Sequence, residues 1–173
     1  RHRRPMKPSE FLLSDLSATA SWGGALARAL VLQPLPEQAF VIHLSGDLGA
    51  GKTEIVRSIL RGFGFSGAVK SPTFTLLEPY NLPSFPIYHF DLYRFSTPDQ
   101  WFDAGFDDTL AGPGLMLLEW PEKALGALAR PDLAVRVDVT GRGDERRLVV
   151  IAGSGAGQRC LTDLRRELGD GTC

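Results

Sequence analysis

The first third of the chain alternates between helix-like and strand-like patterns of apolar residues. Over Ser17–Leu32 the apolar residues recur at the three- and four-residue spacing of one helix face. The short apolar run Ala39–Leu44 is typical of a buried strand. A glycine-rich stretch, Ser45–Gly51, follows it. The apolar face of a second helix, which ends near Gly62, is then marked by Ile55, Val56, Ile59 and Leu60.

The remainder of the chain reads as strands separated by short helices. Strands are predicted over Thr73–Leu77, Ile87–Tyr93, Leu115–Leu118, Leu133–Val139 and Arg147–Ile151. The first two are joined by the turn-rich segment Pro79–Ser84, and the last two form an antiparallel hairpin. Helices are predicted from Pro98, over Pro121–Leu128 and around Leu161–Leu168. We therefore expect one α/β domain over residues 11–168, after a disordered leader (1–10) and before a short tail (169–173).

The glycine-rich stretch carries the strongest chemical signal. Its residues are Gly46, Asp47, Leu48, Gly49, Ala50, Gly51, Lys52 and Thr53, which match the Walker A pattern G-x-x-x-x-G-K-[ST]. Glycines let backbone N–H groups converge on phosphate oxygens, and the following helix adds its positive end. Lys52 supplies a mobile positive charge, and the Thr53 hydroxyl is an oxygen ligand suited to Mg²⁺.

The context of this motif separates it from a chance match. At background residue frequencies the pattern arises in roughly one chain in a hundred of this length. Here it lies between a strand pattern and a helix pattern, which is the context that a P-loop requires. The sequence therefore predicts a P-loop NTPase-like fold: a mostly parallel sheet flanked by helices, with a C-terminal antiparallel hairpin.

A P-loop needs an acidic partner for its metal, and two residues qualify. Glu119 follows the apolar run Leu115–Leu118, as Walker B carboxylates do at the end of a buried strand. Asp91 lies in a strand where alternation puts His89, Asp91 and Tyr93 on one face. The alternative for either acid is a solvated surface charge. On the same grounds His89 reads more readily as a sheet histidine, Trp120 as a packing residue and Arg94 as a salt-bridge partner.

Composition restricts the partners and the compartment. The chain has 173 residues, 43% of them hydrophobic, and a formal net charge of -1, so a protein that wraps nucleic acid unaided is not expected. The cysteines Cys160 and Cys173 lie in no metal-binding spacing. No apolar stretch approaches the roughly 20 residues that span a membrane, and no apolar region follows the basic start at Arg1. We expect a cytoplasmic protein without a membrane partner.

Four ordered segments give the chain a family resemblance. They are Gly46–Thr53, Ser71-Pro72-Thr73-Phe74-Thr75, His89-Phe90-Asp91-Leu92-Tyr93-Arg94 and Glu119-Trp120-Pro121-Glu122. In this order and spacing, from about Leu12 to Ile151, the chain resembles the bacterial TsaE (YjeE) family. The resemblance implies a P-loop ATPase, with ATP and Mg²⁺ as cofactors, in the biosynthesis of threonylcarbamoyladenosine in ANN-decoding tRNAs. It also implies the proteins TsaD and TsaB as partners, with tRNA contacted through their complex.

The resemblance assigns roles to residues of this chain. Lys52 holds phosphate, Thr53 and Glu119 bind Mg²⁺, Thr73 belongs to a switch-like loop, and Trp120 lies beside the nucleotide. Asp91 is the expected water-orienting acid and, with Lys52, the expected catalytic pair, although the roles of Asp91 and Glu119 can be exchanged. Two departures stand out: Glu54 replaces a common second threonine, and Trp101–Leu110 lacks the usual acidic pattern.

Other functions remain open to a P-loop domain. A small-molecule kinase usually adds an arginine-rich lid, and the one arginine-dense stretch, Arg142–Arg147, reads as a hairpin turn. Guanine-specific GTPases resemble one another in sharing an N-K-x-D motif that reads the base. This sequence contains no such motif. A binding module without turnover is the remaining alternative, because Lys52 and Thr53 indicate binding only.

Overall fold

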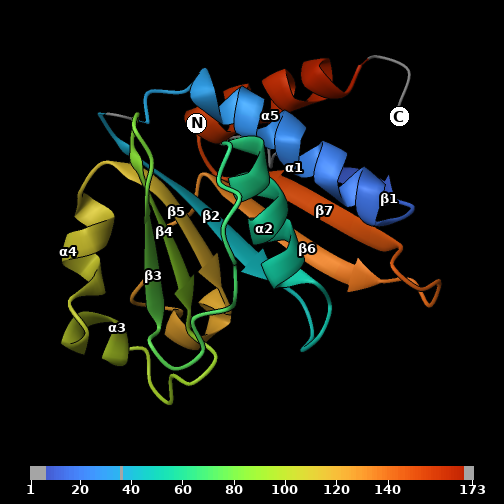
Figure 1. The fold of residues 1–173 in the computed structure, drawn as a ribbon. Helices are drawn as coiled ribbons and strands as arrows, with labels where there is room; N and C mark the ends of the chain where they lie inside the picture. The colour runs from blue at the N-terminus through green and yellow to red at the C-terminus, as the bar shows by residue number, and fades with distance from the viewer. Residues whose placement is uncertain (1–6, 36, 170–173) are drawn as a thin grey trace.

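A computed structural model of the chain describes residues 7–35 and 37–169 (Figure 1). In this part of the chain seven strands form one sheet in the order β1-β7-β6-β2-β5-β4-β3. The strands are β1 (Ser9–Leu13), β2 (Ala39–Ser45), β3 (Leu77–Asn81), β4 (Pro86–Asp91), β5 (Gly114–Glu119), β6 (Leu133–Val139) and β7 (Arg146–Ala152). Strands β6, β2, β5 and β4 run parallel, and β1, β7 and β3 extend the sheet in antiparallel fashion. The predicted mostly parallel sheet with a C-terminal hairpin is therefore confirmed.

Helices cover the two faces of the sheet unequally (Figure 1). The long helices α1 (Leu16–Val31), α2 (Lys52–Gly62) and α5 (Gly155–Leu168) pack on one face. The short α3 (Gln100–Asp103), α4 (Phe106–Ala111) and the 3₁₀ helix η1 (Pro121–Ala124) pack on the other face, against β4 and β5. Strand β5 contributes Leu115 and Leu117 to the first core and Met116 and Leu118 to the second. Burial on both faces explains why its sequence is continuously apolar.

Helices α1 and α2 approach each other closely because small residues lie between them. A Cβ atom added at Gly23 of α1 would lie 2.1 Å from Ser58 Oγ and 2.5 Å from the Ser58 backbone carbon. At the adjacent Gly24 the same atom would lie 3.5 Å from Arg28 Nη1, an ordinary contact. Gly23 thus permits the contact that seats α2, and with it the loop that precedes α2, against α1.

Several predicted boundaries differ from the structure. The strand expected over Thr73–Leu77 instead runs over Leu77–Asn81, and Thr73 lies in a turn. This strand includes Pro79, which the sheet tolerates because β3 is an edge strand and does not need every backbone N–H. The strand Ser9–Leu13 was not predicted, so Ser9 and Glu10 of the expected leader are paired with β7.

The short helices also differ from their predicted bounds. The helix expected from Pro98 begins at Gln100, and the one expected over Pro121–Leu128 is a 3₁₀ helix that ends at Ala124. Helix α5 is longer than expected, because the Ser154 side chain caps its start. Residues 1–6 of the expected leader, and the expected tail beyond Gly169 with Cys173, lie outside the described residues. Among the helices that are described, none is long and apolar enough to cross a membrane.

Candidate functional site

The loop between β2 and α2 curls in the manner that its glycines predicted. Gly46 and Gly51 have φ angles of 146° and 107°, which other residues rarely adopt. A Cβ atom at Gly46 would lie 2.5 Å from the Val137 carbonyl oxygen, so only glycine fits there. Gly51 is the N-cap of α2, and no described side chain accepts a hydrogen bond at this cap. The first backbone N–H groups of α2 therefore point out of the helix start as donors.

Lys52 lies inside the loop rather than in solvent. Its side chain is 4% exposed, and Nζ donates hydrogen bonds to the carbonyl oxygens of Gly46 (2.6 Å) and Asp47 (2.9 Å). The same ammonium lies 4.1 Å from the centre of a Trp120 ring. Burial lowers the pKa of Lys52 from its usual value, and the carboxylates of Glu119 and Glu122 act in the opposite direction. The lysine is thus a positive group held at the floor of the loop.

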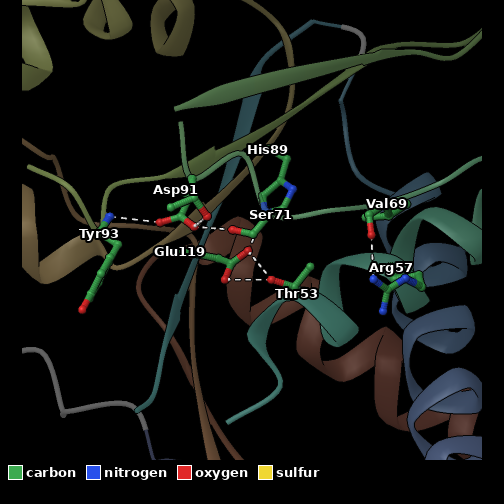
Figure 2. Close-up of polar contacts among 9 residues, drawn as sticks. Thr53, Arg57, Val69, Ser71, His89, Asp91, Tyr93 and Glu119 are labelled. Atoms are coloured by element: carbon green, nitrogen blue, oxygen red, sulfur yellow. Dashed lines mark hydrogen bonds and ion pairs between the residues drawn. The ribbon is translucent and has the colours of Figure 1, made fainter. Parts of the chain in front are cut away.

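Glu119 ends β5 directly beside the start of α2. Thr53 Oγ1 lies 3.0 Å from Glu119 Oε2 and 3.2 Å from Oε1, and His89 Nε2 lies 2.6 Å from Oε2 (Figure 2). The three side chains come from α2, β5 and β4, and Glu119 is 3% exposed. A buried carboxylate and a hydroxyl in contact offer oxygen ligands of the type that Mg²⁺ prefers. No group of three or more histidine, cysteine or carboxylate residues within the described ranges could hold a metal ion by itself.

Asp91 ends β4, the strand next to β5, and pairs in register with Glu119. Its Oδ2 accepts hydrogen bonds from the hydroxyls of Ser71 and, at 3.5 Å, Thr73, while its Oδ1 accepts one from Tyr93 N at 2.9 Å (Figure 2). Asp91 therefore joins the end of β4 to the loop that carries Ser71 and Thr73. Because parallel strands end at one edge of the sheet, both predicted acids lie at the same edge as the P-loop.

A pocket of about 330 Å³ opens between these groups. It is lined by Leu48, Gly49, Gly51, Lys52, Thr53, Ser71, Thr73, Asp91, Tyr93, Glu119 and Trp120. Trp120 has a φ angle of 60°, an uncommon left-handed conformation for a bulky residue, and its ring packs against Tyr93 at 4.9 Å. Backbone strain of this kind clusters at binding sites.

Most residues predicted for the site meet at this pocket. Of the P-loop residues, Leu48, Gly49, Gly51, Lys52 and Thr53 line it, together with Thr73, Asp91, Glu119 and Trp120. Gly46, Asp47 and Ala50 shape the loop behind them, and the carbonyl oxygens of Gly46 and Asp47 accept from Lys52. Arg94 lies elsewhere, with its guanidinium 4.5 Å from the centre of the Phe74 ring. Glu54, the departure after the P-loop, pairs with Arg57, which also donates to Val69 O in the loop before Ser71 (Figure 2).

Three contributors to the site were not identified from the sequence. Ser71 binds Asp91, and His89, which read as a sheet histidine, binds Glu119. Arg146 of β7 donates from Nε to Ala50 O at 2.7 Å, and from Nη1 to the carbonyl oxygens of Gly143 and Glu145. It thereby ties the P-loop to the β6–β7 hairpin. Arg146 is separated from Ala50 by 96 positions, and no local pattern signals a contact of that kind.

Comparison with known proteins gives a consistent result along the chain. A sequence model of the family described as "Threonylcarbamoyl adenosine biosynthesis protein TsaE" matches residues 13–149. A Haemophilus influenzae protein named tRNA threonylcarbamoyladenosine biosynthesis protein TsaE is 40% identical over 133 residues, which cover 77% of this chain and 83% of that protein. A protein of the same name from Synechocystis is 43% identical over 121 residues, 66% of this chain and 71% of the relative.

A solved structure shares the fold. The crystal structure of YdiB from Bacillus subtilis superposes on the chain with a TM-score of 0.78 and 26% sequence identity. The superposition covers 96% of this chain and 100% of that one. The similarity thus extends beyond the P-loop, which many nucleotide-binding proteins share, to the whole sheet and its helices.

Proposed function

Because the chain belongs to the TsaE family, we propose that it is an ATP-binding and ATP-hydrolysing subunit that supports a TsaD–TsaB complex in the cytoplasm. The reaction it supports is the threonylcarbamoyl modification of adenosine in ANN-decoding tRNAs. The observation that carries the proposal is the contact of Glu119 with Thr53, the residue that follows the P-loop lysine in the sequence. A phosphate cradle and an adjacent pair of hard oxygen ligands are the two parts that Mg²⁺-ATP requires.

The phosphates fit the loop through groups already in place. The backbone N–H donors at the start of α2 and the Lys52 ammonium present positive charge to the same side of the pocket. Trp120 and Tyr93 supply aromatic surface at the same pocket. In this assignment Gly46–Thr53 hold the nucleotide, with Thr73 and Trp120 completing the contacts.

Thr53 and Glu119 would hold Mg²⁺. At phosphate sites this ion takes one or two protein oxygens and completes its shell with phosphate and water, so a dedicated protein cage is not needed. When bound, the ion neutralises charge on the phosphate oxygens. The chain's own contribution is to keep the hydroxyl of Thr53, at the start of α2, in contact with the carboxylate of Glu119, at the end of β5.

Asp91 is the group that we assign to the attacking water. Its carboxylate lies in the pocket wall and is oriented by three donors, from Ser71, Thr73 and Tyr93. A carboxylate fixed in this way can accept a proton from a water molecule or orient it for in-line attack. Since Ser71 and Thr73 belong to the loop before β3, a movement of that loop would also move the acid or change its charge environment.

Recognition of the tRNA is the part of the reaction that we assign to the partners rather than to this chain. The formal net charge of -1 offers no excess of basic residues for tRNA. We therefore assign tRNA recognition to the TsaD–TsaB complex, with this chain coupling its ATP cycle to that complex.

Measurement of Mg²⁺-dependent ATP hydrolysis by the purified protein, alone and with TsaB and TsaD, tests the proposal. We expect weak turnover alone, a higher rate with both partners, and loss of activity in Lys52→Ala. ATP consumption that the partners leave unchanged would contradict coupling. Transfer of phosphate to an acceptor other than water would instead identify a small-molecule kinase.

A further inference from the structure

His89 lies beneath the proposed metal site without lining the pocket. It belongs to β4, two positions before Asp91, and its side chain is fully buried. Its Nε2 atom lies 2.6 Å from Glu119 Oε2, on the neighbouring strand β5. Its Nδ1 atom is also buried and has no hydrogen-bond partner among the described residues. Within the described chain, Glu119 is thus the polar contact of this imidazole.

The chemistry of the pair fixes which nitrogen carries the proton. A carboxylate offers only acceptors, so a 2.6 Å contact requires Nε2 to carry a hydrogen and donate it to Oε2. Burying a polar ring in an apolar core has a cost unless the ring gains a contact of this kind. The contact with Glu119 is therefore the reason, on physical grounds, for a histidine rather than an apolar residue at this place in the core.

The two carboxylate oxygens of Glu119 have different hydrogen-bond partners. Oε2 receives hydrogen bonds from His89 (2.6 Å) and from Thr53 (3.0 Å), whereas the contact of Oε1 with Thr53 is the longer one at 3.2 Å. A donor behind the carboxylate restricts its rotation and occupies one oxygen. Thr53 contacts both oxygens, and Oε1 is the one that His89 does not contact.

We propose that His89 is a positioning residue, which holds the Glu119 carboxylate in the orientation that binds the divalent cation of the nucleotide complex. This inference rests on the proposed function, because it assumes a metal-nucleotide site at Thr53 and Glu119. Groups that hydrogen-bond a metal ligand from behind orient it, and their loss commonly weakens metal binding by about 10–100-fold.

The structure supplies a matched control for this residue. His43 lies on β2, the other neighbour of β5, and is also a histidine whose Nε2 is buried with no partner in the described part of the chain. Unlike His89, it makes no hydrogen bond or ion pair to a pocket-lining residue within the described ranges. His43→Leu therefore removes an imidazole from the same sheet without removing a hydrogen bond to the site.

The test uses Mn²⁺, followed by electron paramagnetic resonance, as a probe of the cation site in the presence of ADP. We expect His89→Leu to weaken Mn²⁺ binding by about 10–100-fold, while ADP affinity in the presence of EDTA is retained. His89→Gln should recover most of the loss, because its side-chain amide can donate to Oε2. His43→Leu should bind Mn²⁺ as the unaltered protein does. Unchanged Mn²⁺ affinity in His89→Leu, or no recovery in His89→Gln, overturns the proposal.

The failure of the proposed function has a different signature. If the unaltered protein binds no Mn²⁺ with ADP, the nucleotide site itself is refuted. If His89→Leu does not fold, ¹⁵N NMR of histidine-labelled, unaltered protein decides the question. We expect His89 in the Nε2–H tautomer, with a proton shift that responds to addition of Mg²⁺ and ADP. The Nδ1–H tautomer overturns the proposal, because Nε2 then has no hydrogen to donate.

Discussion

Thr53 and Glu119, 66 positions apart in the sequence, are in contact: Oγ1 of Thr53, in the first turn of α2, lies 3.0 Å from Oε2 of Glu119, the last residue of β5. The contact joins the start of the P-loop helix to the end of the central strand. If both are ligands of one cation, the hydroxyl matters and the methyl group of Thr53 does not.

Replacing Thr53 separates the hydroxyl from the methyl group. Thr53→Val keeps the shape of the side chain but removes the proposed ligand, whereas Thr53→Ser keeps the hydroxyl. We expect Mg²⁺ to strengthen ATP binding in the unaltered protein and in Thr53→Ser, and this gain to fall by roughly tenfold or more in Thr53→Val. Fluorescence titration with labelled ATP, with and without Mg²⁺, measures it. Equal gains in the two variants would contradict the assignment.

Asp91 is expected to affect turnover more than binding. Asp91→Asn keeps the size of the side chain and removes its negative charge, so ATP hydrolysis should fall by roughly 100-fold or more, while ATP affinity changes little. Single-turnover hydrolysis and equilibrium binding, measured on the same preparation, test the split. Ser71→Ala is the control, because it removes a donor to Asp91 but keeps the carboxylate. An equal loss of binding and turnover in Asp91→Asn would refute the division of roles.

The contact between α1 and α2 predicts opposite effects at two adjacent glycines. Gly23→Ala places a methyl group against the Ser58 backbone and should lower the free energy of unfolding by about 1–3 kcal/mol. Gly24→Ala meets only ordinary contacts and should raise it by up to about 1 kcal/mol, because alanine favours the helix. Urea unfolding of both variants measures the difference. The prediction fails if the two substitutions have the same effect.

His43 predicts a pH dependence of stability. Burial lowers the pKa of His43 from 6.5 to about 4, so between these values the unfolded chain binds a proton that the folded chain does not. Stability should therefore fall as the pH drops from 6.5 to 4, by at most roughly 3 kcal/mol from this residue. In His43→Leu this contribution is absent. As the pH falls from 6.5 to 4, the free energy of unfolding of the variant should therefore rise relative to that of the unaltered protein. A difference that is constant with pH would show that His43 does not titrate in this way.

The sequence predicted the parts of the site that depend on local patterns. The P-loop follows from residue spacing between a strand and a helix, and Glu119 follows from its place at the end of a continuously apolar run. Both signals are local because a strand buried on both faces needs apolar residues at every position. The edge strands β1 and β3 lack that signal, since each pairs on one side only and β3 even contains Pro79.

The contacts that orient the site could not be predicted in the same way. Alternation along β4 places His89 and Asp91 on one face but does not say that β5 is the neighbouring strand. Without that neighbour, neither the contact of His89 with Glu119 nor its geometry follows. The contact of Arg146 with Ala50 likewise depends on how the β6–β7 hairpin meets the P-loop, which only the assembled sheet determines.

The position of β5 has a consequence for the order in which the molecule assembles. Strand β5 is made after β2 and β4 but lies between them in the sheet. Until Gly114–Glu119 has been synthesised and inserted, β2 and β4 have no partner in common, and each presents an open edge. We expect folding to be slow and non-local, with aggregation most pronounced in chains that end before β5. Acquisition of Mg²⁺-dependent ATP binding would then report the insertion of β5, since Glu119 is the last residue of that strand.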